Sequence, residues 1–217
     1  MFQISKIERA SKSKPLYHIY ADDTLLLTVS EETLIRFTLS KGQIISQEQL
    51  DAIRRYDQVQ RCVQQALRYL SRRGHFVREL QRKLKQKGFE TSVIEQAVAY
   101  LRDKNYLNDE QLSDLFIKDG INLKKYGPLL LKKKLLEKGV APEIIEGRLQ
   151  KAYPKELQEQ TARALSEKKI KSFTPRDSVQ KRRQKLAAFL QQRGFGWDII
   201  QVMLAQLPPE EPENEGE

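Results

Sequence analysis

The chain has 217 residues, 31% charged and 39% hydrophobic, which allows one or two compact units or a short array of repeats. The strong periodicity of the apolar residues argues for folding rather than disorder. The single cysteine, Cys62, excludes an intramolecular disulfide framework and suits a reducing cytosol. Apolar runs fall short of the roughly 20 residues of a membrane helix, and the polar start is unlike a signal peptide. We therefore predict a soluble, cytoplasmic protein.

The charge of the chain is unevenly distributed. The formal net charge is +10, but the residues after Pro209 include five glutamates and no base, so the other 209 residues carry +15. A body this basic attracts polyanions, either nucleic acid or an acidic protein surface. A lysine-rich surface kept for solubility is the alternative. We predict that residues 208–217, rich in proline and glutamate, form a disordered acidic tail.

Residues 1–56 are predicted to form a strand-rich region with short helices. The first 29 residues alternate with period two, Asp22-Asp23 predicts a hairpin turn, and residues 12–15 predict an exposed loop. Ser30 followed by two glutamates predicts the start of a helix with Leu34, Ile35 and Phe37 on its apolar face and Gly42 as its stop. Residues 46–49 fit a capping box, which predicts a second helix through Leu50 and Ile53.

Three copies of one helical unit fill the rest of the chain. When three glycines are aligned, leucines stand eight and four residues before each one, and apolar residues stand six and ten residues after it. A lysine or arginine directly precedes each glycine. The aligned sets are Gly88, Gly139 and Gly194; Leu80, Leu131 and Leu186; Leu84, Leu135 and Leu190; Ile94, Ile145 and Ile200; and Val98, Leu149 and Leu204.

This pattern predicts three helices in each copy. Leucines four residues apart lie on one helix face, and the glycine supplies the left-handed residue that ends this helix. Another amphipathic helix follows, and one more is predicted upstream, at about residues 57–71, 109–123 and 155–169. We predict a mostly α protein: repeats at 57–107, 108–153 and 154–207 in an elongated array, after a small β-hairpin and helix region.

Several stretches resemble the RecX family of regulators of the RecA recombinase. They are residues 66–73, Glu79-Leu80 with Leu84, residues 87–89, residues 106–109, residues 125–128, residues 138–140 and residues 193–195. One departure is Phe76, where members often have a serine or threonine before the second helix of the first copy. The resemblance implies a helical protein that lies in the groove of the recombinase–DNA filament and restrains its assembly, ATP hydrolysis and strand exchange.

No catalytic, metal or cofactor site is expected. Two histidines and one cysteine are too few for a zinc site, and the glycine patterns of phosphate-binding loops are missing. Cys62 lies in a helical apolar pattern, which favours a buried structural thiol over a nucleophile. His75 lies among arginines at a helix junction, which favours capping or exposure. We therefore predict that the protein is not an enzyme.

The repeated cations are the candidate binding residues. Arg82-Lys83 and Lys133-Lys134 stand six and five residues before their glycines, and we call these four residues the basic stripe. Lys83 with Lys87, and Lys134 with Lys138, are like charges one turn apart, which destabilise a helix, so their repetition favours a surface that faces a polyanion. The alternative is that Lys87 and Lys138 complement the helix dipole and that the other cations form a solvated face. Aromatic residues are not interleaved with these runs, which argues against base stacking. The full candidate set is Arg72, Arg73, Arg82, Lys83, Lys87, Lys132, Lys133, Lys134, Lys138, Lys181, Arg182 and Arg183.

From the resemblance we expect a monomeric regulator that binds the RecA–DNA filament and modulates its assembly, ATPase and strand exchange, with inhibition as the favoured direction. The alternative from a different class is a free-standing basic DNA-binding protein, whose helix pairs read duplex DNA. A helical scaffold unrelated to recombination is a third reading. Strong, sequence-dependent binding to bare duplex would favour the second reading, and binding to neither DNA nor filament would favour the third.

Overall fold

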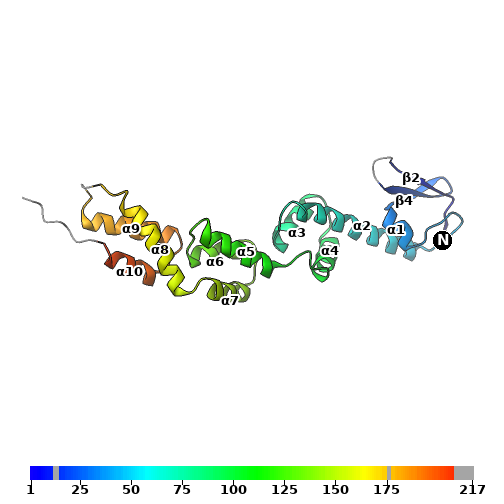
Figure 1. Cartoon of the computed structure of the whole chain (residues 1–217). Coiled ribbons are helices and arrows are strands. Elements are labelled where there is room, and N and C mark those ends of the chain that lie inside the picture. Colours follow the sequence, from blue (N-terminus) through cyan, green and yellow to red (C-terminus); the bar gives the residue numbers. More distant parts are fainter. Residues whose placement is uncertain (12–14, 175–176, 208–217) are drawn as a thin grey trace, which may run out of the picture. The chain divides into compact units, whose positions relative to one another are not determined.

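The computed structural model describes residues 1–11, 15–174 and 177–207, and this part of the chain is mostly helical (Figure 1). The predicted class is confirmed: three three-helix repeats follow a small N-terminal β region. The chain divides into two compact units, residues 1–108 and residues 109–217. None of the described helices is long and apolar enough to cross a membrane. The predictions for the 12–14 loop, for Pro175-Arg176 and for the acidic tail lie outside the described residues.

The N-terminal part of unit 1 contains two small antiparallel sheets. Strands β2 (Lys6–Arg9), β3 (Leu16–Ala21) and β4 (Thr24–Ser30) form one sheet, and β1 (Phe2–Gln3) pairs with β5 (Ile44–Ile45). The predicted hairpin turn between β3 and β4 is confirmed, because Ala21 pairs with Thr24 and both intervening aspartates have positive φ. In Figure 1 the three-stranded sheet lies beside helices α1 and α2, which both contact β4.

Helix α1 (Glu31–Arg36) starts as predicted but ends earlier. The Ser30 side chain accepts a hydrogen bond from the Thr33 backbone N–H. The helix ends six residues before Gly42, because Thr38 adopts a left-handed conformation with φ of 50°. The prediction that Ile35 belongs to the buried face is wrong, since this short helix leaves its side chain 70% exposed.

Helix α2 (Gln47–Leu70) joins two elements that were predicted as separate helices. The capping box at Ser46 and Gln49 is present, and from it the helix continues for 24 residues. The predicted start of the first repeat helix at residue 57 is wrong, because glycine and proline are absent between residues 46 and 71. Only the packing partner changes: Leu50 and Ile53 lie in the core of the β region, whereas Cys62 and Ala66 lie in the core of the first repeat.

In the described residues, eight further helices follow α2 and form the rest of the repeats. In unit 1, α3 begins at Val77, directly after the buried Phe76. The helices are α3 (Val77–Gln86) and α4 (Thr91–Asp103) in the first repeat, α5 (Asp109–Asn122), α6 (Pro128–Glu137) and α7 (Pro142–Ala152) in the second, and α8 (Lys155–Ile170), α9 (Val179–Gln192) and α10 (Trp197–Ala205) in the third. The predicted first helices of the second and third repeats, α5 and α8, agree with the structure within one residue.

The repeat register is confirmed by burial and by the helix ends. All six aligned leucines have 0% exposure, and the apolar residues six and ten positions after the glycines are buried as well. The glycines have φ between 83° and 87°, the left-handed conformation that was predicted. After each glycine the next N–H bonds to the carbonyl of the second aligned leucine, at 3.4, 3.1 and 3.1 Å, which closes a Schellman motif.

Within unit 2, the second and third repeats join through backbone groups. The N–H of Gly127 donates to the Arg193 carbonyl at 2.7 Å, and the N–H of Leu129 donates to the Gly194 carbonyl at 2.9 Å. A β-carbon at Gly127 would lie 2.4 Å from the Gly194 carbonyl carbon, and one at Gly194 would lie 2.3 Å from the Leu130 nitrogen. Both positions therefore require glycine. We call this contact the glycine junction.

Candidate polyanion-binding surface

The basic stripe separates into exposed and half-buried members. Arg82 and Lys133, six residues before their glycines, are exposed, and their side chains make no hydrogen bond or ion pair with any described residue. Lys83 and Lys134, one position later, are half-buried. A rotation of about 100° per residue separates the two positions around a helix, which turns one position outward and the other toward the preceding helix or loop.

Lys83 is held by groups from two other segments. Its ammonium lies 5.1 Å from the centre of the Tyr69 ring on α2 and 3.0 Å from Nε2 of His75 in the α2–α3 loop. Glu79, one turn earlier on α3, lies 3.9 Å away and also pairs with Arg73. The face of an aromatic ring attracts a cation, so Lys83 contributes to packing as well as to surface charge.

His75 is buried, with only 1% of its side chain exposed, so of the two expectations, capping or exposure, exposure is wrong. Its Nδ1 lies 2.9 Å from the Arg73 carbonyl, which cannot donate, so Nδ1 carries the hydrogen. Nε2 then accepts from the Lys83 ammonium. Burial lowers the pKa of His75, and the nearby Arg73 and Lys83 charges act in the same direction. Neutral His75 thus links the α2–α3 loop to α3.

Aromatic rings also accompany the cations of the second repeat. The Lys134 ammonium lies 5.3 Å from the Tyr126 ring centre, and that of Lys138 lies 5.3 Å from the Phe116 ring centre. These rings come from the preceding loop and helix rather than from the basic runs themselves. Aromatic residues are not interleaved with the basic runs in the sequence, but in the fold two of them lie beside cations of these runs.

The remaining candidates of the first two repeats differ in how they are engaged. Arg73 forms a two-bonded ion pair with Glu79, and Lys132 pairs with Glu146 at 2.6 Å. Arg72 and Lys87 are exposed, and neither side chain has a hydrogen bond or ion pair within residues 1–11, 15–174 and 177–207. Four candidates, Arg72, Arg82, Lys87 and Lys133, are thus free to meet an external anion.

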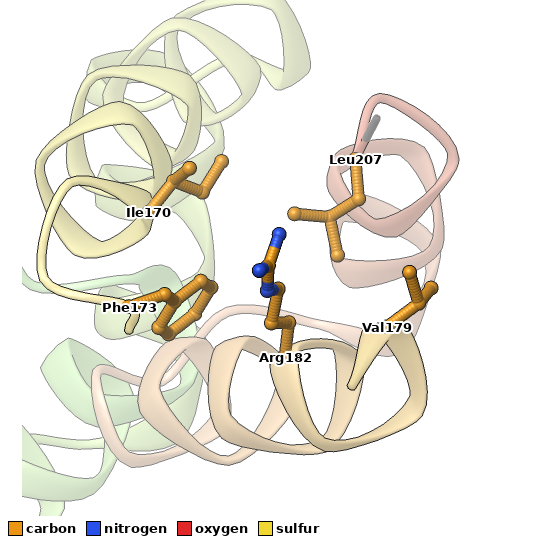
Figure 2. Close-up of a pocket in the computed structure, with 5 residues that line it drawn as sticks. All are labelled: Ile170, Phe173, Val179, Arg182 and Leu207. Carbon is orange, nitrogen blue, oxygen red and sulfur yellow. The ribbon is translucent and has the colours of Figure 1, made fainter. Parts of the chain in front are cut away.

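The candidates of the third repeat serve its own packing. Figure 2 shows the Arg182 guanidinium between Ile170 and Phe173 on one side and Leu207 on the other. Arg182 also donates to the Thr174 carbonyl at 3.4 Å, and its Nε is buried without a partner among the described atoms. Arg183 donates to the Leu204 carbonyl at 3.2 Å. Arg182 thus packs between apolar side chains of the third repeat, and Arg183 bonds to a carbonyl in the last turn of α10.

Lys181 of the same helix is engaged by a buried carboxylate. Asp177 accepts from Lys185 at 2.7 Å, lies 3.2 Å from Lys181, and accepts from the Thr174 N–H. These bonds, led by the one from Lys185, hold the pKa of Asp177 well below its usual range. Lys181 and Lys185 are therefore partly neutralised, and Asp177 is a local structural element that sequence reasoning missed.

The thiol and the potential metal ligands are candidates for chemistry other than charge. The Cys62 thiol is fully buried, and this burial raises its pKa to about 11, which keeps it protonated and unreactive. Within the part of the chain that the structure describes, no cluster of three His, Cys, Asp or Glu side chains could hold a metal ion.

Models of known protein families match all three repeats. Residues 62–101 match the first three-helix domain of RecX, residues 108–147 match the second and residues 156–204 match the third. Together these matches cover more than half of the chain.

Curated proteins and solved structures give the same result. The regulatory protein RecX of Streptococcus agalactiae serotype V is 31% identical over 202 residues, which cover 93% of this chain and 77% of that protein. That of Bacillus thuringiensis is 34% identical over 214 residues, which cover 97% and 78%. A crystal structure of regulatory protein RecX is similar with a TM-score of 0.77 and 28% identity, over 95% of this chain and 100% of that one. The RecX structure from Lactobacillus salivarius has a TM-score of 0.65 and 26% identity, over 70% and 97%.

Proposed function

This chain belongs to the RecX family of regulatory proteins, and we propose that it binds the RecA–DNA filament and inhibits its assembly, ATPase and strand exchange. It acts as a monomer in the cytoplasm, in DNA recombination and repair, and without a cofactor of its own. Its action is binding rather than catalysis.

The observation that carries this proposal is the set of four exposed cations, Arg72, Arg82, Lys87 and Lys133, on a scaffold of the RecX type. Arg82 lies on α3, Lys87 is the residue that ends α3, and Lys133 lies on α6. Arg72 lies in the loop between α2 and α3. Cations without internal partners are available to phosphate oxygens or to carboxylates. The filament offers both kinds of group, because it combines a DNA strand with a protein surface.

The test is the DNA-dependent ATPase of RecA in the presence of increasing amounts of the protein. We expect the wild-type protein to lower the ATPase rate, and a variant with all four exposed cations changed to Gln to do so much less. A matched control replaces four other exposed lysines, Lys41, Lys118, Lys168 and Lys171, with Gln. The control removes the same charge, so it distinguishes an effect of these four cations from an effect of net charge. Inhibition by the four-cation variant equal to that of the wild type would exclude a role for these cations in filament binding.

The second candidate function is that of a free-standing DNA-binding protein, which the same exposed cations favour. Direct phosphate contacts give a salt slope of log K of roughly 0.9 per contact, so loss of four contacts lowers the slope by up to about 3.6. Bare-duplex affinity at several salt concentrations measures this slope. Strong binding with sequence preference, together with an unchanged RecA ATPase, would favour the second function over the first.

A further inference from the structure

The second helices of the three repeats have the same buried face but different exposed faces. Their outer face holds the residues ten, six and three positions before the closing glycine. These positions lie within about 60° of one another around the helix, on the side opposite the buried leucines. All of the residues at these positions are exposed: Arg78, Arg82 and Lys85 on α3; Leu129, Lys133 and Leu136 on α6; and Gln184, Ala188 and Gln191 on α9.

The outer face of α3 is cationic along its whole length. Its side chains Arg78, Arg82 and Lys85 make no hydrogen bond or ion pair with any residue in the described ranges. Three cations in a row suit a chain of phosphates, whose charges repeat along a strand. The outer face of α9, with two glutamines and an alanine, offers neither charge nor apolar area.

The outer face of α6 has a different chemistry. Leu129 is 57% exposed and Leu136 is 39% exposed, and Lys133 lies between them, one turn from each. Apolar side chains at the first, fifth and eighth positions of a helix face are the usual anchors of a helix in an apolar groove, and here a lysine takes the middle position. A phosphate backbone does not bury leucines, whereas a protein surface does.

We infer that the outer face of α6, Leu129, Lys133 and Leu136, is a docking surface for a protein. The partner presents an apolar groove for the two leucines and a carboxylate opposite Lys133, as the charge of this lysine requires. The outer face of α3 takes phosphates instead. This inference rests on the proposed function, because it assigns the protein and the nucleic acid of the filament to two different repeats.

The test compares two variants with the wild-type chain. The first carries Leu129→Gln and Leu136→Gln, which remove the apolar anchors, preserve the charge and keep good helix formers. The second carries Arg78→Gln, Arg82→Gln and Lys85→Gln on the equivalent face of α3. Each is measured for inhibition of the ATPase of RecA on single-stranded DNA, for affinity to the same bare DNA at several salt concentrations, and for association state by sedimentation. Thermal unfolding checks that both variants are folded.

We expect the α6 variant to bind bare DNA like the wild type. Its half-inhibiting concentration should rise by about tenfold or more, since buried interface anchors are typically worth at least that factor. The α3 variant should bind bare DNA less tightly, with a salt slope reduced by up to about 2.7.

Three results would distinguish the possible failures. Wild-type inhibition by a folded α6 variant overturns the inference but leaves the proposed function intact. A wild-type dimer that the α6 variant converts to an equally inhibitory monomer means that this face joins two copies of the chain, which also overturns it. A wild-type protein that leaves the RecA ATPase unchanged rejects the proposed function itself.

Discussion

The two compact units of this protein join their parts by different means. In unit 1, one uninterrupted helix, α2, belongs both to the core of the β region and to the core of the first repeat. In unit 2, two repeats of the same kind meet through the glycine junction, where backbone groups bond directly. A shared helix tolerates many side chains, whereas a backbone contact tolerates only glycine. The units therefore differ in the kind of substitution that disrupts them.

Side chains of α2 also complete the edge of the sheet in unit 1. Arg54 and Arg61 donate to the carbonyls of Leu26 and Thr28, and Asp57 accepts from the Ser30 N–H at 2.7 Å. These carbonyls and this N–H lie along the outer edge of β4. A helix thus satisfies polar groups of an edge strand that would otherwise pair with another chain.

The largest losses of stability are expected from substitutions in the buried leucine face of the second helices, which occurs in each unit. Truncation of Leu84 in unit 1, or of Leu190 in unit 2, to Ala leaves a cavity in a fully closed core. We expect each change to lower the free energy of unfolding by about 2–5 kcal/mol, measured by urea denaturation. A loss below about 1 kcal/mol for both would contradict the repeat register, since even a partly collapsed cavity costs more than this.

Gly194 in the glycine junction can be compared with Gly88, the aligned glycine of unit 1, which lies outside any such junction. Gly88 and Gly194 have φ of 87° and 86°, but a β-carbon has open space at Gly88 and meets the Leu130 backbone at Gly194. Gly88→Ala should therefore cost only the strain of the left-handed conformation, about 1–2 kcal/mol. Gly194→Ala should cost a further ~1–3 kcal/mol, from overpacking against the second repeat. Equal losses in urea denaturation would mean that the junction adjusts freely.

In unit 1, substitution of Asp57 tests the connection between α2 and the end of β4. It is 6% exposed, accepts from Ser30 and Thr33, and pairs with Arg61 at 2.6 Å. Asp57→Ala leaves these donors without an acceptor, so we expect a loss of about 3 kcal/mol in the free energy of unfolding. Asp51→Ala, which removes a half-exposed carboxylate 3.8 Å from Arg54, is the control and should cost under about 0.5 kcal/mol. Similar losses for both variants would mean that Asp57 does not stabilise the contact between α2 and the end of β4.

The sequence predicts the repeats well because the same residue types recur at the same distances from three glycines. It does not predict the length of α2, since the change of packing partner near residue 57 leaves no break in the helical pattern. Nor does it predict the glycine junction, which depends on how two loops meet. Gly127 precedes Pro128 and, from sequence, looks like an ordinary turn residue.

For the candidate site, the sequence predicted which residues carry the charge but not which groups surround them. The sequence identifies the cations, but the groups that engage some of them come from other segments, as Tyr69, Tyr126 and Phe116 do. Local reasoning therefore gives equal weight to Arg82 and Lys83, which differ in exposure and in partners. It also treats the outer faces of α3 and α6 as equivalent, because their basic pairs occupy the same register.

The smallest effect expected is a pH dependence of stability in unit 1 that comes from His75. Burial lowers its pKa in the folded chain, whereas the unfolded chain has the ordinary value near 6.5. Well above pH 6.5 neither state binds this proton. As the pH falls below 6.5, the unfolded state takes it up first, so the free energy of unfolding decreases until the pH also passes the lower, folded pKa. The slope from one proton is at most about 1.4 kcal/mol per pH unit.

Urea denaturation of the wild type and of His75→Gln between pH 7.5 and 5.5 measures this contribution, because other titrating groups are common to both proteins. The wild type should lose more stability than the variant over this interval. Because neutral His75 accepts from Lys83, its protonation removes that acceptor and places two cations side by side. Lys83→Gln should therefore make the pH dependence shallower, since it removes one of the charges that lower the pKa of His75. Parallel curves for all three proteins would show that His75 titrates alike in the folded and unfolded chains.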